Sequence, residues 1–361
     1  MSRVIITCGS GGVGKTTISA ALALRLAEEG KRVVVLTIDP AMRLADALGL
    51  KGLDNQPQRV PTERGELLAL MLDPKQTFDE LVSRHAPSAE VRDRILANHY
   101  YRSVSTRLPG VHEYMAMEKL LALHREADAD VIVLDTPPTR HALDFLVAPD
   151  RMSGLMDEGV MRWIVLPASV GGWRMLEMGS DMLAGVLKRL LGEETVGEIA
   201  EFFAAFQGLW GGFRERSSAV RALLRAPDTR FLLVTAPAPG ARAEALAFLE
   251  VLQKEGMPFA GFLVNRCVIA APGPVSWPPP LPGDESRWEA VGDSVEAVLA
   301  RHRALVVTQD AAIADLVAHA PRGACAWRVP EADGDVHDLA GLRLLGRAME
   351  QAGAIRGLDT P

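Results

Sequence analysis

The sequence predicts an α/β fold with a doubly wound, mostly parallel sheet and an α-helical insertion. Short β-branched runs alternate with helical segments along most of the chain, and this alternation is typical of a parallel sheet covered by helices on both faces. A glycine-rich loop separates the first of these strands from the first helix. Residues 151–225 break the alternation, because they contain helical patterns rich in methionine and aromatic residues.

The glycine-rich loop has the sequence of a phosphate-binding loop. It fits the pattern G-x-x-x-x-G-K-[ST] and lies between a strand over residues 4–7 and a helix over 18–29. Its backbone N–H groups and the helix N-terminus would bind phosphate, which predicts a P-loop NTPase fold. Lys15 would reach the β- and γ-phosphates, and Thr16 would bind Mg²⁺. The expected nucleotide-binding residues of the loop are Gly11, Gly12, Val13, Gly14, Lys15, Thr16 and Thr17. An ordinary glycine-rich turn before a helix is the alternative.

Two of the predicted strands lead into aspartates. The strand over residues 32–37 is followed by Asp39, and the strand over 130–135 ends in Asp135. Ligands of α/β sheets bind at the carboxyl ends of the strands, and Asp135 is placed like the acid that holds Mg²⁺ in phosphate-loop ATPases. Either aspartate could instead only cap the helix that follows it.

The remaining elements are predicted from apolar periodicity. We expect strands over 67–72, 230–235, 259–266, 304–307 and 326–330, and helices over 111–126, 242–255 and 339–349. Helices within 75–126 should pack beside the insertion, residues 272–282 should form a proline-rich surface loop, and residues 1–361 should make one ATPase domain.

The predicted insertion at 151–225 carries apolar faces at helical spacing. The residues of these faces that could form a groove for a hydrophobic client are Met182, Val186, Leu190, Phe202, Phe203, Phe206 and Trp210. Such stripes are more often core, whereas flexible methionines suit surfaces that bind varied apolar partners. Both interpretations stay open.

Composition excludes several classes of protein. A net charge of −7 argues against non-specific nucleic-acid binding. The three cysteines are far apart and form no C-x-x-C pair, so we expect neither zinc nor disulfides, and a cytoplasmic location. We expect no signal peptide at the N-terminus, and no apolar run is long enough to span a membrane.

The motifs together resemble those of the arsenite-pump and tail-anchored-protein-targeting ATPases. The resemblance covers nearly the whole chain and is carried by residues 11–17, 39–41, 135–141 and 264–265. It implies a Mg²⁺-dependent ATP hydrolase with a deviant phosphate loop, whose nucleotide state closes a dimer and controls binding of a hydrophobic client. The alternatives are a nucleotide-switched regulatory protein without a client groove and a subunit for metalloid efflux, although the insertion lacks the cysteines that metalloids prefer.

The resemblance also implies roles for single residues. Asp39 would position the attacking water and act with Lys15 in catalysis, and Asn265 would contact adenine. A late loop would pack on the same base through Val329, Pro330 and Glu331. The second switch would contain Asp135, Pro138, Thr139, Arg140 and His141.

The chain departs from the family pattern at several positions. Ser10 stands where most members have a lysine that reaches the partner subunit's nucleotide. Met42 replaces a histidine, Pro137 and Arg140 replace an alanine and a glycine, and the zinc-binding cysteine pair is missing. We therefore expect either a homodimer or a heterodimer with a paralogue that keeps the lysine.

Overall fold

The structure is a computed structural model, and it describes residues 2–99, 101, 111–137, 210–270, 285–332 and 334–359. An eight-stranded sheet forms its centre, in the order β3-β4-β2-β5-β1-β6-β7-β8. Neighbouring strands are parallel throughout, except that β3 runs antiparallel to β4. This topology confirms the predicted α/β fold.

The strands are β1 (Arg3–Cys8), β2 (Arg32–Thr37), β3 (Gln58–Val60), β4 (Glu66–Met71), β5 (Val131–Asp135), β6 (Thr229–Thr235), β7 (Phe259–Cys267) and β8 (Cys325–Pro330). The central strands β1, β2 and β5 are buried along almost their full length. Their sequences are nearly continuous apolar runs, because helices cover both faces of a parallel sheet.

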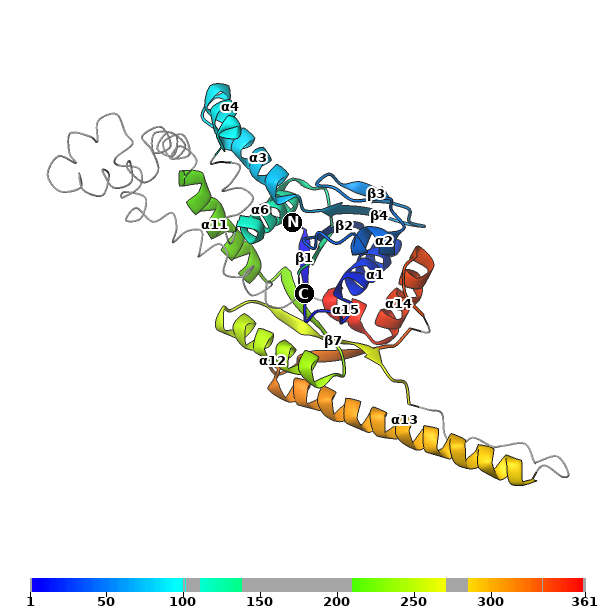
Figure 1. Cartoon of the computed structure of the whole chain (residues 1–361). Helices are drawn as coiled ribbons and strands as arrows, with labels where there is room; N and C mark the ends of the chain where they lie inside the picture. The colour runs from blue at the N-terminus through cyan, green and yellow to red at the C-terminus, as the bar shows by residue number, and fades with distance from the viewer. Residues whose placement is uncertain are drawn as a thin grey trace, which may run out of the picture.

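Two apolar cores lie on the two faces of the sheet. Successive residues of a strand point to opposite faces, so Ile5 belongs to one core while Val4 and Ile6 belong to the other. On the Ile5 face pack α1 (Lys15–Glu28), α2 (Arg43–Leu48), α14 (Leu339–Gln351) and α15 (Ala354–Asp359), visible together in Figure 1. On the other face pack α6 (Val111–Glu126), α11 (Trp210–Arg225), α12 (Pro239–Lys254) and α13 (Glu285–His319).

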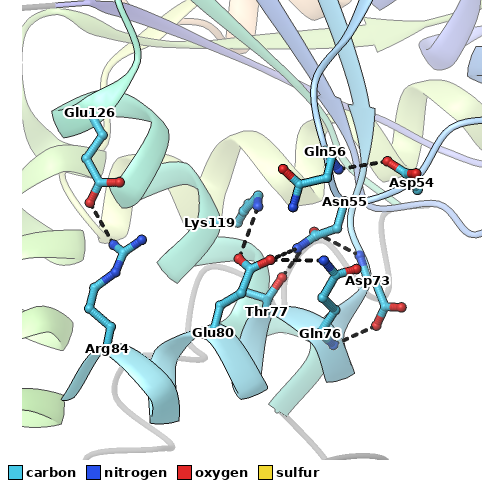
Figure 2. A network of polar contacts seen from close by, with 10 residues as sticks. All are labelled: Asp54, Asn55, Gln56, Asp73, Gln76, Thr77, Glu80, Arg84, Lys119 and Glu126. Carbon is cyan, nitrogen blue, oxygen red and sulfur yellow. Dashed lines mark hydrogen bonds and ion pairs between the residues drawn. The ribbon is translucent and has the colours of Figure 1, made fainter. Parts of the chain in front are cut away.

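A polar network attaches α3 (Pro74–His85) to the rest of the protein (Figure 2). The Asn55 side chain is fully buried, accepts from the Asp73 backbone N–H at 3.2 Å and donates to Glu80 Oε1 at 3.2 Å. The other oxygen of Glu80 accepts from Lys119 Nζ on α6 at 3.4 Å. Helix α3 is thereby joined to α6, and α4 (Ala89–Ala97) follows it.

One predicted strand is wrong. Residues 304–307 lie inside α13, which runs without interruption from Glu285 to His319 and extends away from the sheet in Figure 1. A four-residue apolar run cannot distinguish strand from helix by periodicity. Here the run has no turn residues at its ends and continues into an alanine-rich sequence, which favours the helix.

Parts of the expected organisation fall outside the described residues. These are most of the 151–225 insertion and the proline-rich loop at 272–282. Only α11 represents the insertion, and it packs against α6. Within the described ranges, no helix has the length and apolar character needed to cross a membrane.

Candidate functional site

The phosphate-binding loop connects β1 to α1 at the middle of the sheet, where β1 lies between β5 and β6. Two glycines allow its path. Gly9 has φ +152°, and a Cβ there would stand 2.0 Å from the Val234 carbonyl oxygen at the end of β6. Gly14 has φ +89°, and its Cβ would stand 2.6 Å from Asn265 Nδ2. No other residue type fits these close approaches without displacing backbone or side chain.

Lys15 is the first residue of α1 and lies inside the curve of the loop. Its side chain is buried, and Nζ donates to the Ser10 carbonyl oxygen at 2.8 Å. Burial lowers the pKa of Lys15, while the charges of Asp135 and Asp39 act to raise it. The ammonium group is therefore held where the loop would surround phosphate oxygens, with both predicted acids in electrostatic range.

Asp135 ends β5 and has no exposed surface. Thr37 Oγ1 donates to one carboxylate oxygen at 3.0 Å, and Ser19 Oγ donates to the other at 3.3 Å. The Thr16 hydroxyl also hydrogen-bonds to the Asp135 carboxylate. Burial raises the pKa of Asp135 to about 6 in spite of these hydrogen bonds. Hydroxyl and carboxylate oxygens are the donors that Mg²⁺ prefers, so the contact between Thr16 and Asp135 fits the predicted metal site.

Neither Ser19 nor Thr37 was identified from the sequence. Thr37 pairs directly with Asp135 in the register of β2 and β5, and Ser19 also bonds to Thr7 Oγ1 at 2.7 Å. The signal was available in the positions of Thr7 and Thr37, because both hydroxyls stand near the carboxyl ends of strands that pair with β5.

Asp39 lies two residues beyond β2, and its side chain is 18% exposed. Its Oδ1 accepts from the Ala41 backbone N–H at 3.0 Å, and its Oδ2 lies 3.4 Å from Arg43 Nη1. The N-cap of α2 is Met42, so the alternative in which Asp39 merely caps that helix is wrong. Arg43 was not identified from the sequence as a site residue.

The residues predicted to contact the base lie at the ends of β7 and β8. Asn265 is buried, and its Nδ2 donates to the Val13 carbonyl oxygen at 2.9 Å, so it contacts the phosphate loop itself. Pro330 is half-buried and Glu331 is exposed. The Val329 side chain is fully buried in the core. Contact of Val329, Pro330 and Glu331 with a base stays a prediction.

Residues 2–272 match the sequence model of the anion-transporting ATPase family. The chain belongs to this family. It is 27% identical over 282 residues to ATPase ARSA1 of Chlamydomonas reinhardtii, covering 73% of this chain and 34% of that protein. It is 35% identical over 148 residues to ATPase get3 of Aspergillus terreus, which covers 41% of this chain and 43% of that protein. It is also 35% identical over 177 residues to ATPase GET3 of Malassezia globosa, which covers 49% of this chain and 50% of that protein. The chain thus spans between a third and a half of these relatives' length.

Membership of the anion-transporting ATPase family confirms the resemblance inferred from the motifs. Part of the expected site lies outside the described residues, namely Pro138, Thr139, Arg140 and His141 of the second switch. The same holds for the possible client residues Met182, Val186, Leu190, Phe202, Phe203 and Phe206, and only the backbone of Trp210 is described.

A separate cavity of about 580 Å³ lies between α3, α6 and α11, and no phosphate-loop residue lines it. Charged groups line it in pairs, including Arg84 with Glu126 at 2.6 Å and Arg216 with Glu118 at 3.0 Å. The acidic side chains and the lysine and arginine side chains of the lining are equal in number, so the cavity has no excess charge for a ligand, and it differs from the apolar groove expected for a client.

Proposed function

We propose that this chain is a Mg²⁺-dependent ATP hydrolase of the arsenite-pump and tail-anchored-protein-targeting type. The observation that carries the proposal is the assembly around the phosphate loop: Thr16 hydrogen-bonds to Asp135, and Lys15 lies in the fields of Asp39 and Asp135. A lysine inside a glycine loop, a hydroxyl beside a carboxylate and a partly exposed acid are the parts that phosphoryl transfer to water requires. Membership of the anion-transporting ATPase family agrees with this chemistry.

In this proposal each residue has a positioning or electrostatic role. Loop N–H groups and Lys15 bind the β- and γ-phosphates, while Thr16 and Asp135 hold Mg²⁺, which when bound neutralises phosphate charge. Asp39 accepts a hydrogen bond from a water molecule and aligns it with the γ-phosphorus. Because the reaction needs little covalent chemistry from the protein, positioning and charge neutralisation suffice.

Two substitutions test the proposal. Lys15→Ala should weaken ATP binding at least about tenfold, because it removes a charge from the anion cradle. Asp39→Asn should keep ATP affinity within about threefold and lower turnover by about a hundredfold or more, because the amide keeps the shape and loses the charge that orients water. Fluorescent-nucleotide titration and phosphate release measure the two effects. Wild-type hydrolysis by Lys15→Ala would refute the site.

We further propose that ATP binding closes a dimer, formed with a second copy or with a paralogue that keeps the lysine at the position of Ser10. Ser10 is buried and neutral, so this chain offers no cation there to a partner. The dimer would control a hydrophobic client bound by the 151–225 insertion of a single ATPase domain. The proposal places the protein in the cytoplasm, with ATP and Mg²⁺ as its ligands.

The client site has its own test. Phe203→Asp combined with Phe206→Asp should reduce binding of a hydrophobic client peptide and leave the melting temperature unchanged. A large loss of melting temperature would instead place both residues in the core, because a buried charge is strongly destabilising. The regulatory alternative predicts no nucleotide-dependent binding of an apolar dye, since soluble monomers rarely expose large apolar patches.

A further inference from the structure

Arg43 is a cation beside the phosphate loop that has no role in the proposed function. It is the first residue of α2, and its side chain is 66% exposed. Its Nη1 lies 3.4 Å from Asp39 Oδ2. Its positive charge also acts on Lys15, where it lowers the pKa of the ammonium group. Arg43 and Lys15 are therefore two cations close enough to repel each other across the mouth of the loop.

The charges around Lys15 indicate what this pair of cations can bind. The groups whose charges act on Lys15 are Asp135, Cys8, Asp39 and Arg43. Cys8 stays neutral, because burial raises the pKa of its thiol to about 12. Asp135 lies beneath the loop among hydroxyl groups and faces the proposed metal site. Of these charged groups Asp39 is the one in contact with Arg43, so an anion that enters beside Asp39 would be attracted by both cations.

The position of Arg43 does little for the stability of α2. A cation in the first turn opposes the helix dipole, which favours acids at that end. The N-cap residue Met42 makes no side-chain hydrogen bond to compensate. The ion pair with Asp39 is open to solvent on the arginine side, and such exposed pairs contribute little to stability. A residue that breaks a local rule without a structural gain is expected at a functional site.

We propose that Arg43 is a further catalytic residue, whose guanidinium group leaves Asp39 and binds an oxygen of the transferring γ-phosphoryl group within the same chain. The move has two effects at once. It brings a second positive charge to the group being transferred, and it frees the Asp39 carboxylate to accept a hydrogen bond from the attacking water. The proposal rests on the proposed ATP hydrolysis, and it means that turnover by this chain needs no lysine from a partner subunit.

The chemical step balances without another reactant. The oxygen of water forms a bond to the γ-phosphorus, and the bond from that phosphorus to the β,γ-bridging oxygen breaks. The bridging oxygen keeps the electron pair and leaves as part of ADP. Both protons of the water remain on the released phosphate, which then equilibrates with solvent. Arg43 stays a cation throughout, and its charge interacts most strongly with the phosphoryl oxygens in the transition state.

The test compares affinity for ADP with affinity for ADP plus aluminium fluoride, a mimic of the transferring phosphoryl group, in the full chain with Mg²⁺. Arg43→Ala should leave the affinity for ADP within about threefold of wild type, and it should weaken binding of the aluminium fluoride complex and the rate of phosphate release by about tenfold to a thousandfold. Arg43→Lys should recover part of the loss, because it keeps the charge and loses the planar fork. Thermal unfolding should show no loss of stability.

Arg59→Ala is the matched control, because Arg59 is also an exposed, ion-paired arginine. It lies on the edge strand β3, and its Nη2 is 2.6 Å from Glu66 Oε1. The control variant should leave both affinities unchanged. The inference would be overturned if Arg43→Ala and wild type bound the aluminium fluoride complex with equal affinity. It would also be overturned if Arg43→Ala hydrolysed ATP faster than wild type, or if wild type bound the complex no more tightly than ADP alone. Failure of the proposed function is distinguishable, because then wild type would release no phosphate from ATP, or Lys15→Ala would hydrolyse ATP as fast as wild type.

Discussion

Replacing Asp135 by asparagine should stabilise the protein against unfolding while it abolishes the proposed activity. The carboxylate is fully buried, and its pKa is about 6 compared with an ordinary value of 3.8. Each pKa unit corresponds to about 1.4 kcal/mol, so the ionised side chain costs the folded state roughly 3 kcal/mol above pH 6. Asparagine keeps the shape without the charge. The amide NH₂ of asparagine would face a hydroxyl that donates to a carboxylate oxygen in the wild type, and this mismatch of two donors should reduce the gain in stability by about 1 kcal/mol.

The sign follows from the raised pKa. Between about pH 4 and 6 the folded wild type holds a proton that the unfolded chain releases, so its stability decreases as the pH increases through this range, and above it the cost is constant. The advantage of Asp135→Asn should therefore be about 2 kcal/mol near pH 7.5 and close to zero near pH 4.5. With an unfolding entropy of roughly 2 cal/mol/K per residue, this corresponds to about 2 to 3 °C in melting temperature.

Urea unfolding of the nucleotide-free protein in the presence of a chelator measures these differences. Asp39→Asn is the matched control, because its carboxylate is partly exposed and already paired with Arg43, and it should show no such gain. An Asp135→Asn variant that is less stable than wild type near neutral pH, or an advantage that does not change with pH, would refute the assignment of a buried, destabilising charge. Hydrolysis should be lost in the same variant, since Asp135 is the proposed holder of Mg²⁺.

Two further predictions concern contacts away from the reacting atoms. Asn265→Ala removes the hydrogen bond to the Val13 carbonyl oxygen, which should weaken ADP binding about fivefold and speed amide hydrogen exchange in residues 9–14; unchanged exchange would contradict a role in fixing the loop. Glu118→Ala leaves the Arg216 charge in a buried site and should cost about 3 kcal/mol in urea unfolding, whereas Glu126→Ala breaks the exposed pair with Arg84 and should cost less than about 1 kcal/mol. Equal costs would show that burial does not decide the strength of these pairs.

Most of the sheet could be predicted because its strands are continuous apolar runs with clear ends. The predicted bounds of β2 and β5 agree with the structure to within one residue. The edge strand β3 was missed, since its three residues include only one buried side chain. The strand expected at 304–307 was wrong for the related reason that a short apolar run carries too little periodicity to identify its own structure.

The candidate site shows the same division between local and non-local information. Lys15, Thr16 and Asp135 could be found because the phosphate-loop pattern and the strand ends are local in the sequence. Thr37 could not be found from any motif, because its hydrogen bond to Asp135 depends on the pairing of β2 with β5. Arg43 was missed for a different reason: an arginine at the start of a helix looks like an ordinary surface residue until its distance to Asp39 is known.

The two edges of the sheet bear on how the protein avoids association with other strands. An exposed strand edge presents unpaired backbone groups that can template aggregation. At one edge β3 is only three residues long and carries outward-facing Arg59. At the other edge β8 carries exposed Arg328, paired with Asp310 on α13 at 2.5 Å, and ends in Pro330, which has no N–H to donate. Charge and shortness at one edge, and charge and proline at the other, thus disfavour the pairing of these edges with further strands.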